Sequence, residues 1–292
     1  MSIRSFVRYT AAGRLLMMPM RFVLFGVPVL WRQLSLVTRW TFASKEYYNW
    51  TYHLTALNEK FLASFIAVIS GHDLAAIEGY LNEVKNDERL RSLLIERTVT
   101  SPDRHSCDTE PRYGRRIGWY ALVRATKPRI IVETGVDRGL GTAVLAAALL
   151  QNAKEGHPGR LYATDIAADC GHLVAEPYKS VCELLIGDSV ESLKKFNQPV
   201  DIFLHDSNHD PAYEWSEFLT IEPRLHPASL VLSDNSPQTT PDVSKLREFA
   251  ARLGRSYLFF QEHPKDHWWR GEGIGVAFVP SVKTYFPGVG PR

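Results

Sequence analysis

The sequence of 292 residues predicts an α/β protein in which helices cover both faces of a mostly parallel, doubly wound sheet. Short apolar runs of strand type alternate with helical stretches after residue 115, which is the pattern of such sheets. With 45% hydrophobic and 23% charged residues, the composition is that of a folded globular chain and excludes a disordered, collagen-like or nucleic-acid-coating protein. The length suits one large domain or one domain with a substantial appendage.

A basic, apolar leader occupies residues 1–45. It holds seven basic residues and no acidic one, whereas the other 27 basic and 32 acidic residues give the rest of the chain a charge of −5. Arginines and prolines interrupt its apolar stretch, and the longest uncharged run, residues 22–31, is half of the about 20 residues that a spanning helix needs. We therefore expect no membrane-spanning helix. The split apolar region also disfavours a secretory signal.

Three interpretations of the leader stay open. It forms an amphipathic helix that lies on a membrane through residues 1–40, with arginines facing lipid phosphates. Alternatively, it is a helical arm that packs on the body or on a second subunit of a homo-oligomer. An arginine-rich, acid-poor leader is also typical of organelle targeting. The three cysteines lack a CxxC spacing, which favours a reducing compartment, so we expect a cytoplasmic protein that is soluble or peripheral to a membrane.

Residues 46–114 are expected to form a helical region before the main domain. Apolar residues recur at helical spacing in three successive stretches. Gly71 ends the first of them, and Asp87 can cap the third. The polar segment 101–114 contains two prolines and is typical of a linker or loop.

The main domain is expected over residues 115–292. A helix at residues 116–125 ends before Pro128, and seven runs of strand type follow it. These runs are residues 129–133, 161–164, 181–186, 202–205, 230–233, 257–261 and 274–279. Helices are predicted between most of them, at residues 142–153, 189–196, 213–225 and 243–253. Ligands of such sheets bind beyond the carboxyl ends of the strands, so the site residues are sought there.

A glycine-containing loop follows the first strand. It runs from Glu133 through Gly135 and Gly139 to Thr142, where a helix begins. Glycines permit a tight turn and let a ligand approach the backbone N–H groups. The spacing is not GxGxxG, so a dinucleotide site is disfavoured. A glycine-rich turn without a ligand is the alternative.

The next two strand ends complete a cleft for an adenosine-containing ligand. Asp165 ends the second strand, where a carboxylate can accept hydrogen bonds from both hydroxyls of a ribose. Asp188 and Ser189 follow the third strand and can border an adenine ring. Each of these residues is also a common helix cap or turn former.

These features resemble the class I S-adenosylmethionine-dependent methyltransferases over residues 115–280. The resemblance lies in the E-x-G-x-x-x-G loop, the acidic second strand end, Gly187-Asp188 and a last strand that begins Gly273-Ile-Gly275. It implies a Rossmann-like sheet of seven strands with the last strand antiparallel, preceded by a helical extension. By this resemblance S-adenosylmethionine is the cofactor, and its expected contacts are Glu133, Gly135, Gly139 and Thr142 for the methionine part, Asp165 for the ribose, Asp188 and Ser189 for the adenine, and His205 in the pocket wall.

Three oxygen-bearing side chains follow the fourth and fifth strands. They are Asp206, Asp234 and Asn235, which neighbouring strand ends can bring together. Carboxylate and amide oxygens suit Mg²⁺, although each residue alone is a common turn former. The arrangement resembles the metal-dependent O-methyltransferases of the catechol and macrolide-sugar types, which implies a Mg²⁺ ion held by these three residues.

The spacing of Asp206 and His209 resembles the sugar-methylating subgroup of those enzymes. It implies that His209 removes the proton from a hydroxyl of a small molecule or sugar. A metal-independent methyltransferase acting on another nucleophile, or a non-catalytic cofactor-binding or membrane-associated protein of the same fold, is the alternative. A nucleic-acid substrate is disfavoured because the main part of the chain is acidic. Candidate walls for the acceptor are residues 112–116, 237–241 and 263–269.

Overall fold

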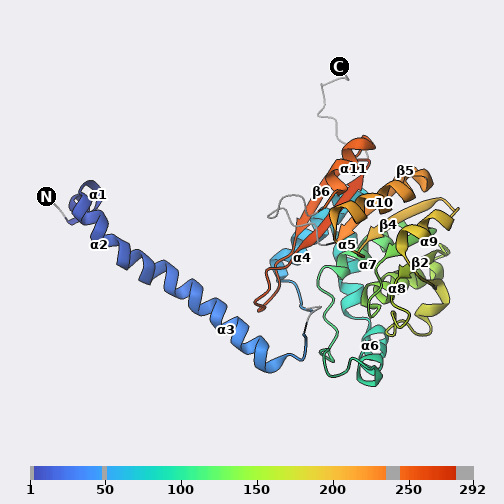
Figure 1. Ribbon diagram of the computed structural model, residues 1–292, viewed down its shortest axis with the longest axis horizontal. Helices are drawn as coiled ribbons and strands as arrows, with labels where there is room; N and C mark the ends of the chain where they lie inside the picture. The colour runs from blue at the N-terminus through green and yellow to red at the C-terminus, as the bar shows by residue number, and fades with distance from the viewer. Residues whose placement is uncertain (1–2, 48–50, 235–243, 281–292) are drawn as a thin grey trace, which may run out of the picture.

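A computed structural model describes residues 3–47, 51–234 and 244–280 of the chain. An α/β body occupies residues 51–280, and a long N-terminal helix projects away from it (Figure 1). Asn235 and the predicted acceptor loop at residues 237–241 lie outside the described residues.

The body is built on one seven-stranded sheet, as the sequence predicts. The strand order is β3-β2-β1-β4-β5-β7-β6, and β7 runs antiparallel to both of its neighbours while the first five strands are parallel. The strands are β1 (Ile130–Thr134), β2 (Arg160–Asp165), β3 (Cys182–Ile186), β4 (Val200–His205), β5 (Leu225–Asp234), β6 (Ser256–Gln261) and β7 (Gly273–Phe278). From β1 the chain adds strands β2 and β3 toward one edge of the sheet, and from β4 it adds β5 toward the other edge. Sheets of this kind bind ligands at the point between β1 and β4 where the strand order changes direction.

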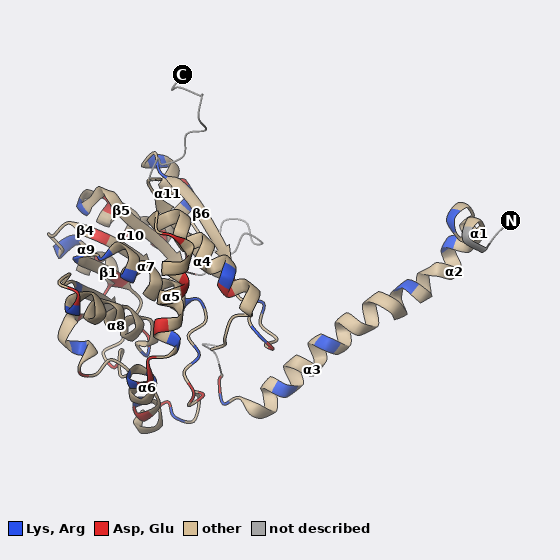
Figure 2. Cartoon of the chain, turned by 180° about the vertical axis from the view of Figure 1, so that it is seen from behind, with Lys and Arg blue, Asp and Glu red and all other residues tan. Residues whose placement is uncertain are grey.

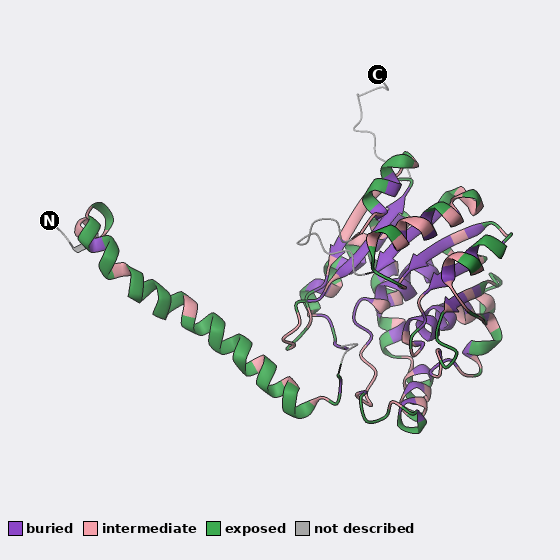
Figure 3. Cartoon of the chain, in the orientation of Figure 1, coloured by how far each residue is buried: buried purple, intermediate pink, exposed green. Residues whose placement is uncertain are grey.

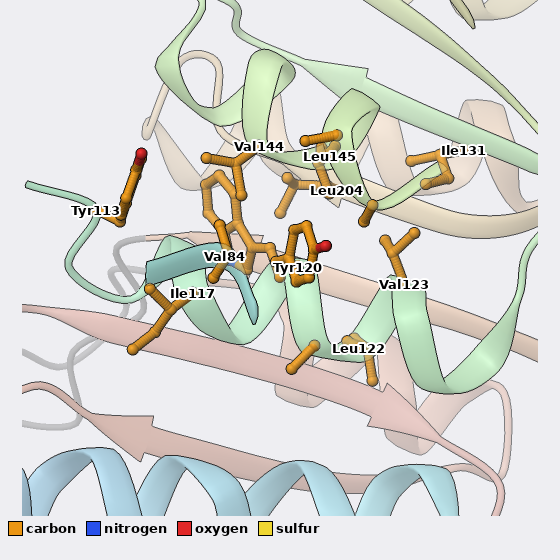
Figure 4. Close-up of a cluster of buried hydrophobic side chains, with 14 of the residues drawn as sticks. Val84, Tyr113, Ile117, Tyr120, Leu122, Val123, Ile131, Val144, Leu145 and Leu204 are labelled. Atoms are coloured by element: carbon orange, nitrogen blue, oxygen red, sulfur yellow. The ribbon is translucent and has the colours of Figure 1, made fainter. Parts of the chain in front are cut away.

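Helices cover both faces of this sheet. One apolar core joins it to α4 (Ala56–Ser70), α5 (Leu74–Lys85), α6 (Glu88–Thr100), α7 (Arg116–Thr126) and α8 (Leu140–Lys154). A second core joins the other face to α9 (Ser189–Lys195), α10 (Pro211–Ile221) and α11 (Leu246–Arg252). Figure 4 shows part of the first core, where Tyr120 and Val123 of α7 face Leu145 of α8 and Ile131 of β1. Burial of these apolar side chains is the main term that holds the layers together.

The predicted helix ends are present in the helical region. Gly71 adopts a left-handed φ of 71° after α4, and Asp87 accepts a hydrogen bond of 2.9 Å from the N–H of Leu90 at the start of α6. The face that α4 buries is less regular than its sequence suggests. Leu57 and Phe61 are 64% and 60% exposed, because the helix packs through a different set of residues that includes Leu62 and Ile66.

The leader is helical, and the helix continues through both of its prolines, Pro19 and Pro28. It comprises α2 (Ala11–Arg21), a π-helical turn (Phe22–Gly26) and α3 (Val27–Ala43), and a shorter helix α1 (Ile3–Tyr9) precedes it. The N–H of Val27 donates to the carbonyl of Phe22, five residues back, just before Pro28. This wider turn accommodates the proline, whose ring would otherwise clash with the preceding helical turn. We call the helix Ala11–Ala43 the arm.

Candidate functional site

One cavity of about 690 Å³ lies beyond the carboxyl ends of β1 to β4. Its walls include Glu133, Asp165, Asp188, Asp206 and His209. The volume lies within the range of about 300–1,000 Å³ that small-molecule sites occupy. The strand ends therefore converge on one concave site.

The loop after β1 is shaped by Gly135. This residue has a φ of 89°, and a Cβ added to it would lie 2.0 Å from the carbonyl oxygen of Asp206. Only glycine fits, and it lines the cavity. Gly139 also has a positive φ of 94°, but it packs on Gly171 and Val174 and does not line the cavity.

Asp165 fixes the same loop from β2. Its Oδ2 accepts hydrogen bonds of 2.8 Å from the N–H groups of both Val136 and Asp137, and its Oδ1 accepts one of 2.8 Å from Ala167. The carboxylate still borders the cavity, and its remaining lone pairs can accept from a ligand hydroxyl. Asp165 thus combines a loop-fixing role with a position suited to a ribose.

Glu133 lies at the floor of the cavity, at the end of β1. It is 1% exposed, and burial raises its pKa to about 8, so that the group holds a proton at neutral pH. The Thr142 hydroxyl donates a 2.7 Å hydrogen bond to it. Thr142 is fully buried and does not line the cavity, so it positions Glu133 and is not itself a ligand contact.

The third strand end is tied to α10. Asp188 caps α9 through a 2.9 Å hydrogen bond from the N–H of Glu191 and accepts another of 2.8 Å from the Tyr213 hydroxyl, and these bonds lower its pKa. Ser189 lies 2.9 Å from the same Tyr213 hydroxyl, and both residues line the cavity. Sequence reasoning missed Tyr213, because nothing local links α10 to this strand end.

A buried carboxylate, Glu217, supports the floor from below. It accepts hydrogen bonds from Thr134 at 2.8 Å, from Ser207 at 2.7 Å and from Ser189. The imidazole Nδ1 of His205 lies 2.7 Å from it. His205 is 1% exposed and does not line the cavity, so its predicted place in the pocket wall is corrected to a supporting place beneath it.

Asp206 and Asp234 meet at the ends of β4 and β5, and a cation already faces them. Arg115 donates through Nε and Nη2 to the two carboxylate oxygens of Asp234, and through Nη1 at 3.0 Å to Glu262. The Asp234 and Glu262 side chains have no exposed surface. Although burial opposes charge on each group, these ion pairs hold the pKa of Arg115 well above its ordinary value and that of Asp234 below it.

The described side chains do not fit the predicted magnesium site. Both oxygens of Asp234 are engaged by Arg115, and burial together with the charge of Asp234 raises the pKa of Asp206 well above its ordinary value. The third predicted ligand, Asn235, lies outside the described residues. The Arg115 guanidinium thus places a positive charge beside these two aspartates.

His209 lies at the rim of the cavity. Its Nε2 is 3.9 Å from Oδ1 of Asp206, and its ring makes an edge contact with His205 at 5.7 Å between centroids. Its side chain is 37% exposed, and partial removal of the ring from water is the main cause that lowers its pKa below the ordinary 6.5. The imidazole is therefore neutral at pH 7 and able to accept a proton.

The remaining cavity wall comes from the helical region and the loop before β7. Tyr52, Arg116, Trp269 and Glu272 line this end, together with Arg115. Of the predicted acceptor walls, residues 115 and 116 and Trp269 thus reach the cavity. The other described residues of these walls do not line it: Arg112 pairs with Asp108, and Trp268 stacks on His267.

Residues 132–236 match a family described as methyltransferase domain. Similar solved structures include the O-methyltransferase TomG from Streptomyces achromogenes in complex with S-adenosylmethionine (19% identity, TM-score 0.45, covering 67% of this chain and 91% of that chain). An O-methyltransferase from Bacillus cereus in complex with S-adenosylhomocysteine is 17% identical with a TM-score of 0.46, and the match covers 66% of this chain and 91% of that chain. The methyltransferase PaMTH1 from Podospora anserina, bound to S-adenosylhomocysteine, is 14% identical with a TM-score of 0.48, and the match covers 80% of this chain and 100% of that chain. No curated protein matches the chain.

Proposed function

We propose that this chain, whose residues 132–236 match a methyltransferase domain, transfers the methyl group of S-adenosylmethionine to a hydroxyl oxygen of a small molecule or sugar. One observation carries the proposal. A single cavity joins the Glu133 loop and Asp165, which suit a nucleoside with an amino-acid tail, to His209, a neutral base at its rim.

The side chains divide the work between binding and proton transfer. Asp165 would accept from the ribose hydroxyls, Asp188 and Tyr213 would border the adenine, and Glu133 would face the charged methionine part. The acceptor hydroxyl enters beside His209, which takes its proton as the oxygen attacks the methyl carbon in line with the departing sulfur. Arg115 pairs with both Asp234 and Glu262, which reduces the repulsion between these carboxylates and the negative charge that develops on the acceptor oxygen.

The reaction itself is tested with S-adenosylmethionine that carries a deuterated methyl group. The protein is incubated with it and with a panel of catechols, phenols and hydroxylated sugars, and the products are identified by mass spectrometry. We expect a labelled methyl ether together with S-adenosylhomocysteine. Labelling of nitrogen or sulfur acceptors alone, or cofactor binding without turnover on the whole panel, would contradict the proposal.

Glu133→Gln is expected to weaken S-adenosylmethionine binding by about tenfold. Glu133 is protonated at neutral pH without a ligand, and the nearby ammonium group of the cofactor is expected to lower its pKa so that it binds as a carboxylate. Glutamine keeps the size of the side chain but cannot ionise, so it cannot form this charged hydrogen bond. Dissociation constants from calorimetry measure the effect. Glu183→Gln, on an exposed position of β3, is the control and should bind like the unaltered protein. Equal affinities for all three proteins would remove Glu133 from the cofactor site.

Removal of metal ions is expected to leave the transfer rate essentially unchanged. Arg115 already donates to both oxygens of Asp234, so a cation of the protein itself engages this carboxylate. Initial rates are compared before and after exhaustive chelation and again after Mg²⁺ is added back. A fall of about tenfold or more that Mg²⁺ restores would reinstate the metal site that the sequence predicts at Asp206, Asp234 and Asn235.

A further inference from the structure

The arm exposes an unusual amount of apolar surface. It is 33 residues long, and an 18-residue window within it has a mean hydropathy of 1.4, so by length and composition alone it could cross a membrane. Gly13 is its only buried residue among those described (Figure 3). Large apolar side chains at least 59% exposed occur along its length: Leu15, Leu16, Phe22, Val23, Phe25, Val29, Leu30, Trp31, Leu34 and Phe42. Removing this much apolar surface from water is strongly favourable, so the arm needs an apolar surrounding.

Four arginines give the arm one charged side. Arg14 and Arg21 are seven residues apart, as are Arg32 and Arg39, and seven residues are close to two helical turns (Figure 2). Arg21 and Arg32, the inner members of the two pairs, are eleven residues apart, which is close to three helical turns. The π-helical turn between the pairs is wider than an α-helical turn. It therefore rotates one pair about the helix axis relative to the other, by less than about 100°, the rotation of one α-helical residue. All four therefore lie on one broad side, and no acidic residue occurs before residue 46.

The base of the arm is fixed to the body next to the cavity. Trp40 contacts the Trp268 ring at 5.3 Å between centroids. Asp108 accepts hydrogen bonds of 3.1 Å from the Ser44 hydroxyl and 2.8 Å from the N–H of Lys45. Trp268 in turn contacts Trp269, which lines the acceptor end of the cavity.

We propose that the arm binds an anionic lipid bilayer, lying along its surface with the arginine side toward the phosphates and the other sides in the acyl region. The charge and the apolar surface each match such a membrane. A spanning arrangement is disfavoured because every window of about 20 residues in the arm, the length that crosses the hydrocarbon, contains at least two of the four arginines. The body then lies at the membrane surface with the acceptor end of its cavity beside the base of the arm.

Flotation of the whole protein with lipid vesicles tests this proposal. We expect it to float with vesicles of phosphatidylcholine and phosphatidylglycerol and to bind pure phosphatidylcholine at least about tenfold more weakly. Replacing all four arginines of the arm by glutamine should reduce binding to the anionic vesicles by at least about tenfold. The matched control replaces four exposed basic residues of the body, Lys154, Lys179, Lys195 and Arg252, by glutamine and should bind like the unaltered protein.

A tag placed before Met1 distinguishes the two orientations. External protease should remove it from protein bound to sealed vesicles, and protection of the tag would overturn the in-plane arrangement in favour of a spanning one. Failure to float, or a stable dimer in lipid-free buffer that persists when anionic vesicles are added, would overturn membrane binding in favour of a second copy as the partner. Neither readout depends on cofactor binding or turnover, so their failure leaves the proposed methyl transfer untouched.

Discussion

Replacing His209 with alanine is expected to lower kcat by about 100-fold or more. The imidazole lies at the cavity rim and is neutral at pH 7 because burial lowers its pKa, so it is the group placed to take the acceptor proton. In the unaltered protein the rate should rise as the pH passes upward through a pKa below 6.5 and then level off, because only the neutral imidazole accepts a proton. The variant should lose this acid limb.

The measurement is a pH profile of kcat for both proteins with the same acceptor. His157→Ala, at an exposed position after α8, provides the control. It should retain the full rate and the same fall of the rate at low pH. A His209→Ala protein with a near-normal rate and an unchanged limb would show that another group takes the proton.

Arg115→Met is expected to lower the free energy of unfolding by about 3–5 kcal/mol. The substitution leaves Asp234 and Glu262 as uncompensated charges in a region where neither has exposed side-chain surface. Urea denaturation monitored by circular dichroism measures the loss. Arg115→Lys keeps the charge but not the forked geometry that engages both carboxylates, so its loss should be smaller. An Arg115→Met protein within about 1 kcal/mol of the unaltered stability would show that the network is not a structural requirement.

The fold follows from local sequence, because each strand of the sheet is a short apolar run whose period can be read directly. The place of Gly135 and Asp165 beside one cavity could also be predicted, since a glycine that ends a strand and an acid that ends the next meet at one sheet edge. The Arg115 network could not. Its partners are 119 and 147 residues away along the chain, and an arginine before a helix carries no signal of such a contact.

The arm shows a second limit of sequence reasoning. Prolines ordinarily interrupt a helix, and the local pattern gave no sign that a π-helical turn before Pro28 would accommodate the ring. Likewise, the regular spacing of Leu57 and Phe61 does not indicate which face of α4 is buried, because the neighbouring helix and strand decide it. Tertiary packing, not periodicity alone, determined these features.

Calorimetric titration with S-adenosylmethionine tests most directly the claim that this cavity holds the cofactor beside His209. We expect one molecule to bind per chain, displaceable by S-adenosylhomocysteine, and an Asp165→Asn variant to bind at least about tenfold more weakly, as loss of charged hydrogen bonds to a ribose implies. Asp169→Asn, at an exposed neighbouring position, should bind normally. Absence of binding to the unaltered protein, or equal affinity in the Asp165→Asn variant, would contradict the claim.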